Sequence, residues 1–555
     1  MKEKNNFIKK ILNKYLFIFI LFLSIPAVRY LFVHGFFGVS DDLHIGWLYE
    51  MDRVVKMFQF PPRYVPDLSF GFGYPLFNFV YPLPFYIGEL IHLLGFSLVN
   101  SVKIVFGLSI PFSMYFMYRF LKEFLSKEMA LAGSVLYVYV PYRAVELFVR
   151  GTIGEIVAFV FIPIIALTIT RLTRKESSLK WVGITAFSTA ALVLSHNIMA
   201  YMFLPFALVL LIARLILLTK NKKRVILHSL TGLILGLLIS VYFWFPAISE
   251  SSLMHYDTVF NFYDHYPTLK QFITPYFGYG ASVPGPYDTM SFYFGLTGLL
   301  VVSLGLISFF IKFKKFSKEE KIFFIWATFI FFVSIFMMNH RSALLWRNIP
   351  LLPYFQFPWR FISMIVFSSP IFLLGFSKCR FGKTISLIVV VLAIILNFGY
   401  FKTSEYLGRE DGYYLNRLIP VPSASNEYRK TSEEYLRLPK DTLVRPSDNF
   451  TRAYADIPAI KQIDEKNALN ATVLTDYKEK FILNYNKYYY PGWFAKIDGK
   501  KAEIIPGIPY GQITISVPEG VHTVEVGYGE SPARLVFDLI SLVGIGIAAL
   551  FIFKK

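Results

Sequence analysis

Two adjacent carboxylates and a nearby imidazole form the most reactive pattern in the chain, Ser40-Asp41-Asp42-Leu43-His44. An aspartate in such a position can act as a general base, and Asp41, Asp42 and His44 together could bind a divalent metal ion. A solvated loop is the alternative, because the spacing alone selects none of these. The pattern marks a first candidate site and leaves open whether Asp41 or Asp42 carries the chemistry.

An arginine and a glutamate flank two glycines in the segment Arg150-Gly151-Thr152-Ile153-Gly154-Glu155. The arginine could position a phosphate group, since guanidinium groups bind phosphate oxygens in pairs. Alternatively, Arg150 and Glu155 could form an ion pair at a membrane interface. The first reading makes this segment a candidate phosphate-binding element, and the second gives it no ligand.

Further polar side chains lie next to apolar segments, where ionisable groups are costly unless they are paired or functional. They are His196, Asn197, Arg341, Arg347 and Arg360. His196 could instead cap a helix, and Arg360, inside Phe357-Pro358-Trp359-Arg360-Phe361, could be an aromatic-belt anchor. If the cations converge, they can bind one anionic group.

Composition defines the elements that must position these residues. The chain has 555 residues, of which 55% are hydrophobic and 17% charged, with a mean hydropathy of +0.50, which predicts a polytopic α-helical membrane protein. A helix needs about 20 apolar residues to cross the hydrocarbon. Twelve segments qualify: 15–33, 100–121, 129–142, 154–171, 180–195, 201–219, 226–247, 292–311, 322–338, 359–377, 384–401 and 534–553. The single cysteine, Cys379, excludes an intrachain disulfide and a cysteine-rich metal site.

The net charge of +19 would, in a soluble protein, suggest a nucleic-acid partner. Here lysine and arginine concentrate in short loops between apolar segments, near 122–127, 171–180, 220–224, 312–321 and 378–383, and at both termini. The positive-inside rule places these loops and both termini in the cytoplasm of a plasma-membrane protein. The charge is therefore a topology signal, and no nucleic-acid partner is expected.

One more apolar stretch, Pro75 to Leu94, would reverse the side of every later loop if it crossed the membrane. Prolines interrupt it at positions 75, 82 and 84, and its aromatic side chains suit the headgroup region. We therefore expect an interfacial or re-entrant segment within a first outer loop that spans 34–99.

Residues 402–533 differ from the rest, with 17 basic and 18 acidic residues in that stretch. Alternating runs predict strands at 481–485, 493–497, 513–517 and 521–526, with turns at Asp498-Gly499 and at 518–520. We expect a transmembrane part at 1–401, an outer, β-rich and sandwich-like domain at 402–533, and a final helix with a basic tail at 534–555.

Strings of proline, glycine and aromatic residues resemble a known family. They are Ser40-Asp41-Asp42, then 61–67 (PPRYVPD), 71–79 (GFGYPLFNF) and 81–84 (YPLP), and later the segments around Arg150, His196 and Arg360. They resemble the multispanning membrane proteins called 6-pyruvoyl-tetrahydropterin synthase-related, which look like GT-C class glycosyltransferases. The segment Tyr490-Pro491-Gly492-Trp493 and the turns near 498 and 518 resemble the C-terminal β domain of YfhO-like membrane proteins.

The resemblance implies an inverting glycosyltransferase that uses a polyprenyl-phosphate sugar donor at the outer leaflet. An aspartate of the first outer loop, Asp41 or Asp42, would be the catalytic base. His44, Arg150, Glu155, His196, Asn197, Arg341, Arg347 and Arg360 would bind the donor phosphate. The acceptor would be a glycan, a glycolipid or a protein. No cofactor is certain, and a divalent metal remains open.

Two other classes of protein fit the same sequence. A transporter or flippase of a lipid-linked sugar would place ionisable groups near the bilayer midplane, whereas the middles of these segments are largely uncharged. A non-catalytic envelope protein would use the outer domain to bind glycan and would not need the aspartates.

Overall fold

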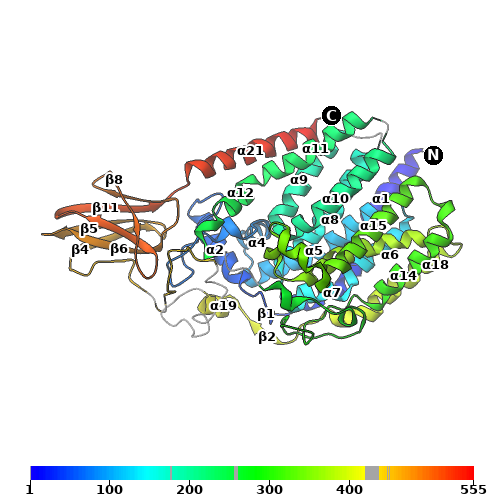
Figure 1. The fold of residues 1–555 in the computed structure, drawn as a ribbon, viewed down its shortest axis with the longest axis horizontal. Coiled ribbons are helices and arrows are strands. Elements are labelled where there is room, and N and C mark those ends of the chain that lie inside the picture. Colours follow the sequence, from blue (N-terminus) through cyan, green and yellow to red (C-terminus); the bar gives the residue numbers. More distant parts are fainter. Residues whose placement is uncertain are drawn as a thin grey trace.

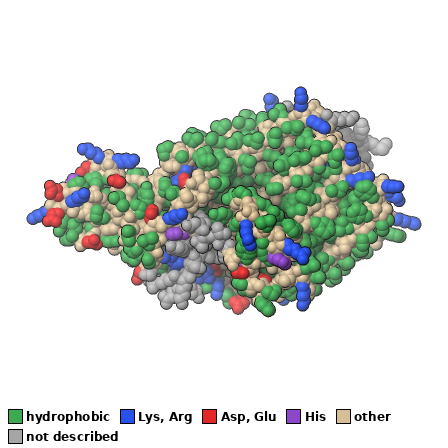
Figure 2. All heavy atoms as spheres, in the orientation of Figure 1, with side chains coloured by type: hydrophobic (Ala, Val, Ile, Leu, Met, Phe, Trp, Pro, Cys, Tyr) green, Lys and Arg blue, Asp and Glu red, His purple; other side chains and the backbone are tan. Residues whose placement is uncertain are grey.

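The structure, a computed structural model, describes residues 2–174, 178–219, 221–255, 261–418, 437–446, 448 and 450–554. Parts of two basic loops, at 175–177 and 220, and the stretch 419–436 of the expected outer domain lie outside these residues. An α-helical body carries a pair of β-sheets that project at one end (Figure 1). Hydrophobic side chains cover most of the visible surface of the helical body, while charged side chains gather toward its ends and on the β-sheets (Figure 2).

Among the described residues, eight segments are long and apolar enough to cross a membrane. They are Tyr15–Phe32, which includes the second half of α1 (Lys2–Val28), α5 (Leu98–Leu121), α8 (Ile153–Leu172), α10 (Asn197–Leu217), α15 (Lys318–Met337), Pro358–Phe376, which contains α17 (Ile362–Ser368), Gly382–Tyr400, which contains α18 (Gly382–Asn397), and α21 (Pro532–Phe553). The polytopic helical class is thereby confirmed.

Shorter or bent helices occupy the other four expected spans. The pair α11 (Lys222–Ile239) and α12 (Val241–Ser249) bends by 66° and would make a ninth span. Helices α9 (Leu179–Ser195) and α14 (Leu296–Ile311) are apolar but have 17 and 16 residues, and α6 (Lys127–Tyr139) has 13. The expected count of twelve therefore depends on these shorter elements.

The proline-rich stretch after residue 74 does not form a continuous helix. It contains the short α3 (Leu76–Phe79) and the 11-residue α4 (Leu83–Leu93). At 1.5 Å per residue, α4 is about 16 Å long, roughly half of the hydrocarbon thickness. A segment of this length fits the interfacial or re-entrant placement that the prolines predict.

Ion pairs join several of the loops that the positive-inside rule assigns to one side. Glu123 pairs with Arg171 and Arg174, and Glu319 pairs with Arg174 at 3.0 Å and with Arg214 at 2.8 Å. Lys378 and Glu320 pair at 2.8 Å. These loops therefore meet at one end of the helical body, as a common side requires. Both chain termini lie toward the upper right in Figure 1, and the β-sheets lie at the left.

The strands after residue 452 form two antiparallel sheets. One sheet has the order β3-β6-β10-β9 and the other β4-β5-β11-β7-β8. Their bounds are β3 (Ala453–Tyr454), β4 (Ile460–Asn467), β5 (Asn470–Tyr477), β6 (Phe481–Tyr488), β7 (Trp493–Ile497), β8 (Lys500–Ala502), β9 (Ile505–Pro506), β10 (Gln512–Val517) and β11 (Gly520–Tyr528). Buried apolar residues from both sheets share one core, including Val473, Leu483, Ile515 and Val524. The sandwich-like part is confirmed.

The two expected turns differ in kind. Asp498 and Gly499 have φ of 51° and 79°, the left-handed values that a tight two-residue hairpin needs, and they join β7 to β8. The turn at 518–519 joins β10 to β11, which belong to different sheets. The chain therefore crosses from one layer of the sandwich to the other there.

Residues 406–418 lie against the helical body rather than in the sandwich. Strand β2 (Tyr406–Arg409) pairs with β1 (Phe36–Phe37) of the first outer loop. Helix α19 (Asp411–Leu418) packs against α2 (His44–Lys56), where a Cβ on Gly46 would lie 3.0 Å from Leu418. This placement brings arginines of the later segment next to the aspartates.

Candidate functional site

Backbone hydrogen bonds hold the aspartate loop against the Arg150 segment. The Ser40 amide donates to the Val149 carbonyl at 3.0 Å, and the Asp41 amide donates to the Arg150 carbonyl at 2.8 Å. Gly151 has a φ of +71°, and a Cβ there would lie 2.7 Å from Val39 Cγ2. Because only glycine permits this approach, Gly151 sets Asp41 beside Arg150.

Glu155, at the start of α8, contacts three of the predicted site residues. Its Oε1 lies 2.9 Å from Arg150 Nη2, 3.3 Å from Arg360 Nε and 3.9 Å from His196 Nε2. The Arg150 guanidinium also donates to Glu146 Oε1 at 2.6 Å and stacks 4.7 Å from the Trp359 ring. Glu146, Arg150, Glu155, His196 and Arg360 thus form one buried cluster of ionisable side chains.

Close packing orients His196 within this cluster. Its Nδ1 accepts the Met199 amide at 3.2 Å as the cap of α10, so in the neutral ring Nε2 carries the proton that faces Glu155. Burial lowers the pKa of His196 to about 3, which keeps the ring neutral. The Tyr81 ring lies 4.9 Å away, and a Cβ on Gly154 would lie 2.4 Å from that ring.

The two aspartates have different surroundings. Asp42 forms an ion pair with Arg417 of α19. In the part of the chain that the structure describes, the Asp41 carboxylate has neither a hydrogen bond nor an ion pair. Desolvation by the surrounding protein raises the pKa of Asp41 above its ordinary value, and the charges of Arg150 and Arg360 oppose that rise. Asp41 is thus half-buried, unpaired and next to cations.

His44 does not join the aspartates in a metal site. It is buried at the start of α2 between Trp47 and Phe85, and desolvation lowers its pKa to about 3. Across the described ranges, no group of three or more His, Cys, Asp or Glu side chains could hold a metal ion. Asp41, Asp42 and His44 therefore do not form a three-ligand cluster.

Three of the predicted donor-binding residues lie apart from the Glu155 cluster. Asn197 is exposed, and its side-chain oxygen accepts the Ile198 amide. Arg347 contacts Tyr263, with the guanidinium 4.9 Å from the ring centroid, and Arg341 is exposed. Arg347 lies on a short helix (Ala343–Asn348) that directs it toward Tyr263. In this structure it is Arg150 and Arg360 that meet at Glu155, and the donor-binding role of Arg341, Arg347 and Asn197 stays a prediction.

Sequence reasoning missed several members of the site. Glu146 lies four residues before Arg150, a helical spacing that could have indicated the pair. Burial raises the pKa of the Glu146 carboxyl, and the positive charge of Arg150 opposes that rise. Arg417 and Arg437 come from the segment after the eleventh span, and Arg437 lies over the Trp47 ring at 5.0 Å. Nothing in the linear sequence links these two arginines to the aspartates.

The helices, the sandwich and the charged cluster define a polytopic membrane protein with a polar site at one end of its helices. Residues 77–407 match the family described as 6-pyruvoyl-tetrahydropterin synthase related domain, a membrane protein. The match covers more than half of the chain, so this chain belongs to that family, as its motifs predicted.

Comparisons with other proteins give distant likenesses. An uncharacterized protein of Lactococcus lactis subsp. cremoris (strain MG1363) is 25% identical over 248 residues, which are 42% of this chain and 39% of that protein. The mycobacterial arabinofuranosyltransferase AftD matches with a TM-score of 0.42 and 12% identity, over 71% of this chain and 28% of that one. The Archaeoglobus fulgidus oligosaccharyltransferase matches with a TM-score of 0.41 and 14% identity, over 78% of this chain and 58% of that one. This chain spans less than two thirds of each of these proteins.

Proposed function

We propose that this chain is a glycosyltransferase that moves a sugar from a polyprenyl-phosphate donor to an acceptor hydroxyl, with inversion at the sugar carbon. The observation that carries the proposal is the Asp41 carboxylate, which is half-buried, unpaired among the described residues and next to two guanidinium groups. A general base must have a free oxygen for the incoming proton, and Asp41 has two.

The reaction assigns a role to each side of the cluster. The Asp41 carboxylate takes the proton of the acceptor hydroxyl while the acceptor oxygen bonds to the sugar carbon. The bond from that carbon to the phosphate oxygen breaks, and polyprenyl phosphate leaves with the electron pair. Arg150 and Arg360 stabilise the negative charge that develops on the leaving phosphate. Glu155 and His196 orient these guanidinium groups.

The proposal includes an orientation in the cell. The Asp41 end and the β-sandwich face outward from the plasma membrane, and both termini and the basic loops face the cytoplasm. A lipid-linked donor would then present its phosphate at the outer leaflet, where Asp41 lies. Donor and acceptor, whether glycan, glycolipid or protein, meet at this surface.

The matched pair of aspartates provides the test. Purified wild-type protein, Asp41→Asn and Asp42→Asn are each incubated with a panel of polyprenyl-phosphate sugars, and release of polyprenyl phosphate is measured. Loss of a general base costs roughly 100-fold to 10,000-fold in rate, which we expect for Asp41→Asn. Asp42→Asn removes only the partner of Arg417 and should retain within about tenfold of the wild-type rate.

Equal rates for wild type and Asp41→Asn would contradict the assigned base. The alternative function, transport of a lipid-linked sugar, predicts another result. The protein would then move the sugar-lipid across vesicle membranes and would release no polyprenyl phosphate from any donor of the panel.

A further inference from the structure

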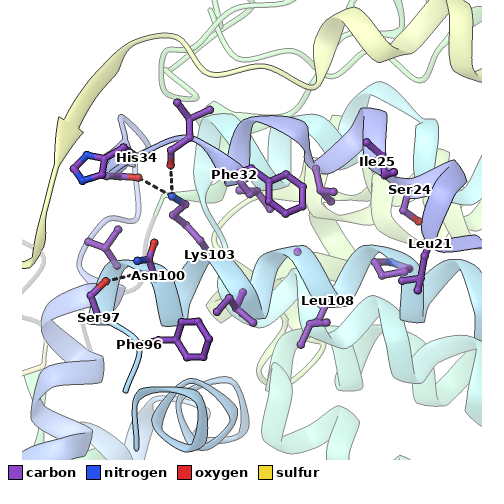
Figure 3. A pocket seen from close by; sticks show the side chains of 18 of the residues that line it. Leu21, Ser24, Ile25, Phe32, His34, Phe96, Ser97, Asn100, Lys103 and Leu108 are labelled. Carbon is purple, nitrogen blue, oxygen red and sulfur yellow. Dashed lines mark hydrogen bonds between the residues drawn. The ribbon is translucent and has the colours of Figure 1, made fainter. Parts of the chain in front are cut away.

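An apolar groove of about 1120 Å³ runs between α1 and α5 on the surface of the helical body. Its walls include Leu21, Ile25 and Phe32 on one side and Leu108 of α5 on the other (Figure 3). Ile104 of α5 also lines it. From residue 18 to residue 32 the groove follows the helix for about 20 Å, more than the ~15 Å hydrocarbon depth of one leaflet. Its shape and lining suit a hydrocarbon chain.

The polar end of the groove carries a buried lysine that is already engaged. Lys103 Nζ donates to the Gly35 carbonyl at 2.9 Å and also to the Val33 carbonyl (Figure 3). Two of its three protons are therefore used, and its main role is to hold the chain after α1 against α5. One donor is left for a ligand.

The amino-terminal end of α5, which also borders the groove, offers no free amides for an anion. Asp411 accepts the Leu98 amide at 2.9 Å and the Val99 amide at 2.8 Å. The Ser97 hydroxyl accepts the Asn100 amide at 3.2 Å. A phosphate would find these helix donors occupied.

Charge at the mouth also disfavours an anionic headgroup. Glu410 and Asp411 both line it, and the exposed Glu410 lies 2.9 Å from His34. A phosphate placed here would face two carboxylates, whereas hydroxyl groups can donate to Glu410 and accept from Lys103 and Asn100. The mouth therefore suits an uncharged, hydroxyl-bearing headgroup.

We propose that this groove binds one hydrocarbon chain of a glycolipid, a lipid whose headgroup is uncharged and rich in hydroxyls. The proposal that the groove binds this lipid depends only on the shape and lining of the groove. The further step, that this glycolipid is the acceptor, rests on the proposed glycosyl transfer. Asp41 comes six positions after Gly35 at the mouth, so the two lie at most about 20 Å apart.

A photoreactive lipid tests the location. Glucosyl-diacylglycerol with a diazirine in one acyl chain is crosslinked to the full-length protein in lipid nanodiscs, and labelled peptides are mapped. Gly107 faces the groove, and a Cβ there would meet only Leu31 at 3.6 Å. Gly107→Phe should therefore fill the groove and lower labelling of α1 and α5 at least about fivefold. Leu542→Phe, on the exposed face of α21, should leave labelling unchanged. Wild-type labelling in Gly107→Phe overturns the site.

Competition tests the headgroup. Unlabelled glucosyl-diacylglycerol should displace the probe at a concentration about tenfold lower than phosphatidylglycerol with the same acyl chains. If both lipids compete equally well, the probe is only part of the annular lipid layer, and the assigned headgroup is wrong. Stronger competition by polyprenyl phosphate would also overturn the assigned headgroup. Glu410→Lys should strengthen competition by phosphatidylglycerol, because it reverses a charge at the mouth. Glu479→Lys, exposed on the β-sandwich, serves as its control.

The binding and transfer proposals fail separately. Asp41→Asn should bind the probe as the wild type does, because Asp41 does not line the groove. Probe binding without any transfer would count against the proposed function only. Transfer to a glycolipid that proceeds unchanged in Gly107→Phe would overturn the acceptor role of the groove.

Discussion

Adjacent aspartates acquire different chemistry from the elements on either side of them. Asp42 pairs with Arg417 of α19. Asp41, one residue earlier, is hydrogen-bonded through its backbone to Arg150, and its carboxylate stays unpaired among the described residues. The sequence left open which aspartate is the base, and we propose Asp41 because Asp42 already pairs with Arg417.

The rate of transfer should depend on pH through Asp41. A base works when deprotonated, and burial raises the pKa of this carboxyl, so kcat/KM should fall as the pH drops through that raised pKa. Arg360→Gln removes a positive charge that opposes the rise. The acidic limb of its pH profile should therefore move to higher pH.

Profiles measured between about pH 4 and 9 check this expectation. The exposed Arg341→Gln provides a control of the same charge change and should leave the limb in place. An acidic limb at the same pH in wild type and Arg360→Gln would show that Asp41 is not the titrating group.

Gly154 should tolerate no side chain. A Cβ there would lie 2.4 Å from the Tyr81 ring and 2.7 Å from the Ser195 carbonyl oxygen. Gly154→Ala should lower the free energy of unfolding by about 1–3 kcal/mol and displace His196. Gly546→Ala, at a helical glycine of α21 with open space around it, should be neutral or stabilising. Thermal unfolding of both variants makes the comparison, and equal transition temperatures would contradict the packing argument.

The motif at 61–79 connects the helices to the β-sandwich. Arg63 lies 2.6 Å from Asp538 of α21 and 3.2 Å from Glu530. Tyr64 donates its hydroxyl proton toward the Tyr488 carbonyl at 2.9 Å, and Lys487 Nζ donates to the Pro66 and Gly71 carbonyls at 2.7 and 2.6 Å. The segment 61–79, which carries part of the family resemblance, therefore serves mainly to join the helices to the β-sandwich.

The network around Arg534 should dominate the attachment of the sandwich. Arg534 is 1% exposed and pairs with Glu250 at 2.9 Å, linking α21 to the end of α12. Removing one partner of a buried pair costs about 3–5 kcal/mol. Arg534→Ala should therefore increase hydrogen exchange in β7 and β11 and lower the transition temperature.

Arg452→Ala is the matched control for that experiment. Its partner Glu465, 3.2 Å away, is 42% exposed, and such surface pairs contribute about 0–1 kcal/mol. Equal losses in the two variants would show that burial of the Arg534 network has no special role.

Charge is segregated between the two ends of the molecule. The Glu123 and Glu319 ion pairs join basic loops at one end. The Glu155 cluster brings together Arg150, His196 and Arg360. The first network pairs residues that the positive-inside rule grouped, so it supports the common side of those loops. Which end faces outward stays a prediction, as do the division into domains at 401 and 533 and the location in the plasma membrane.

The single cysteine allows a direct test of orientation. Cys379 lies in a basic loop that should be cytoplasmic, so a membrane-impermeant maleimide should label it only after cells are permeabilised. In a Cys379→Ser background, Glu479→Cys on the sandwich should be labelled in intact cells. Labelling of Cys379 but not of residue 479 from outside would reverse the proposed orientation.

The sequence by itself determined the membrane class, most spans, the strand positions near 481–526 and the family. The class, the spans and the strands depend on local composition or periodicity, and the family depends on short motif strings. The chain carries all of these along its length. Only the tertiary structure decided that α19 supplies Arg417 to Asp42, that Glu155 gathers Arg150, His196 and Arg360, and that Arg341 and Arg347 lie elsewhere. These facts depend on contacts between residues distant in sequence, because packing sets the direction of each side chain and charge alone does not.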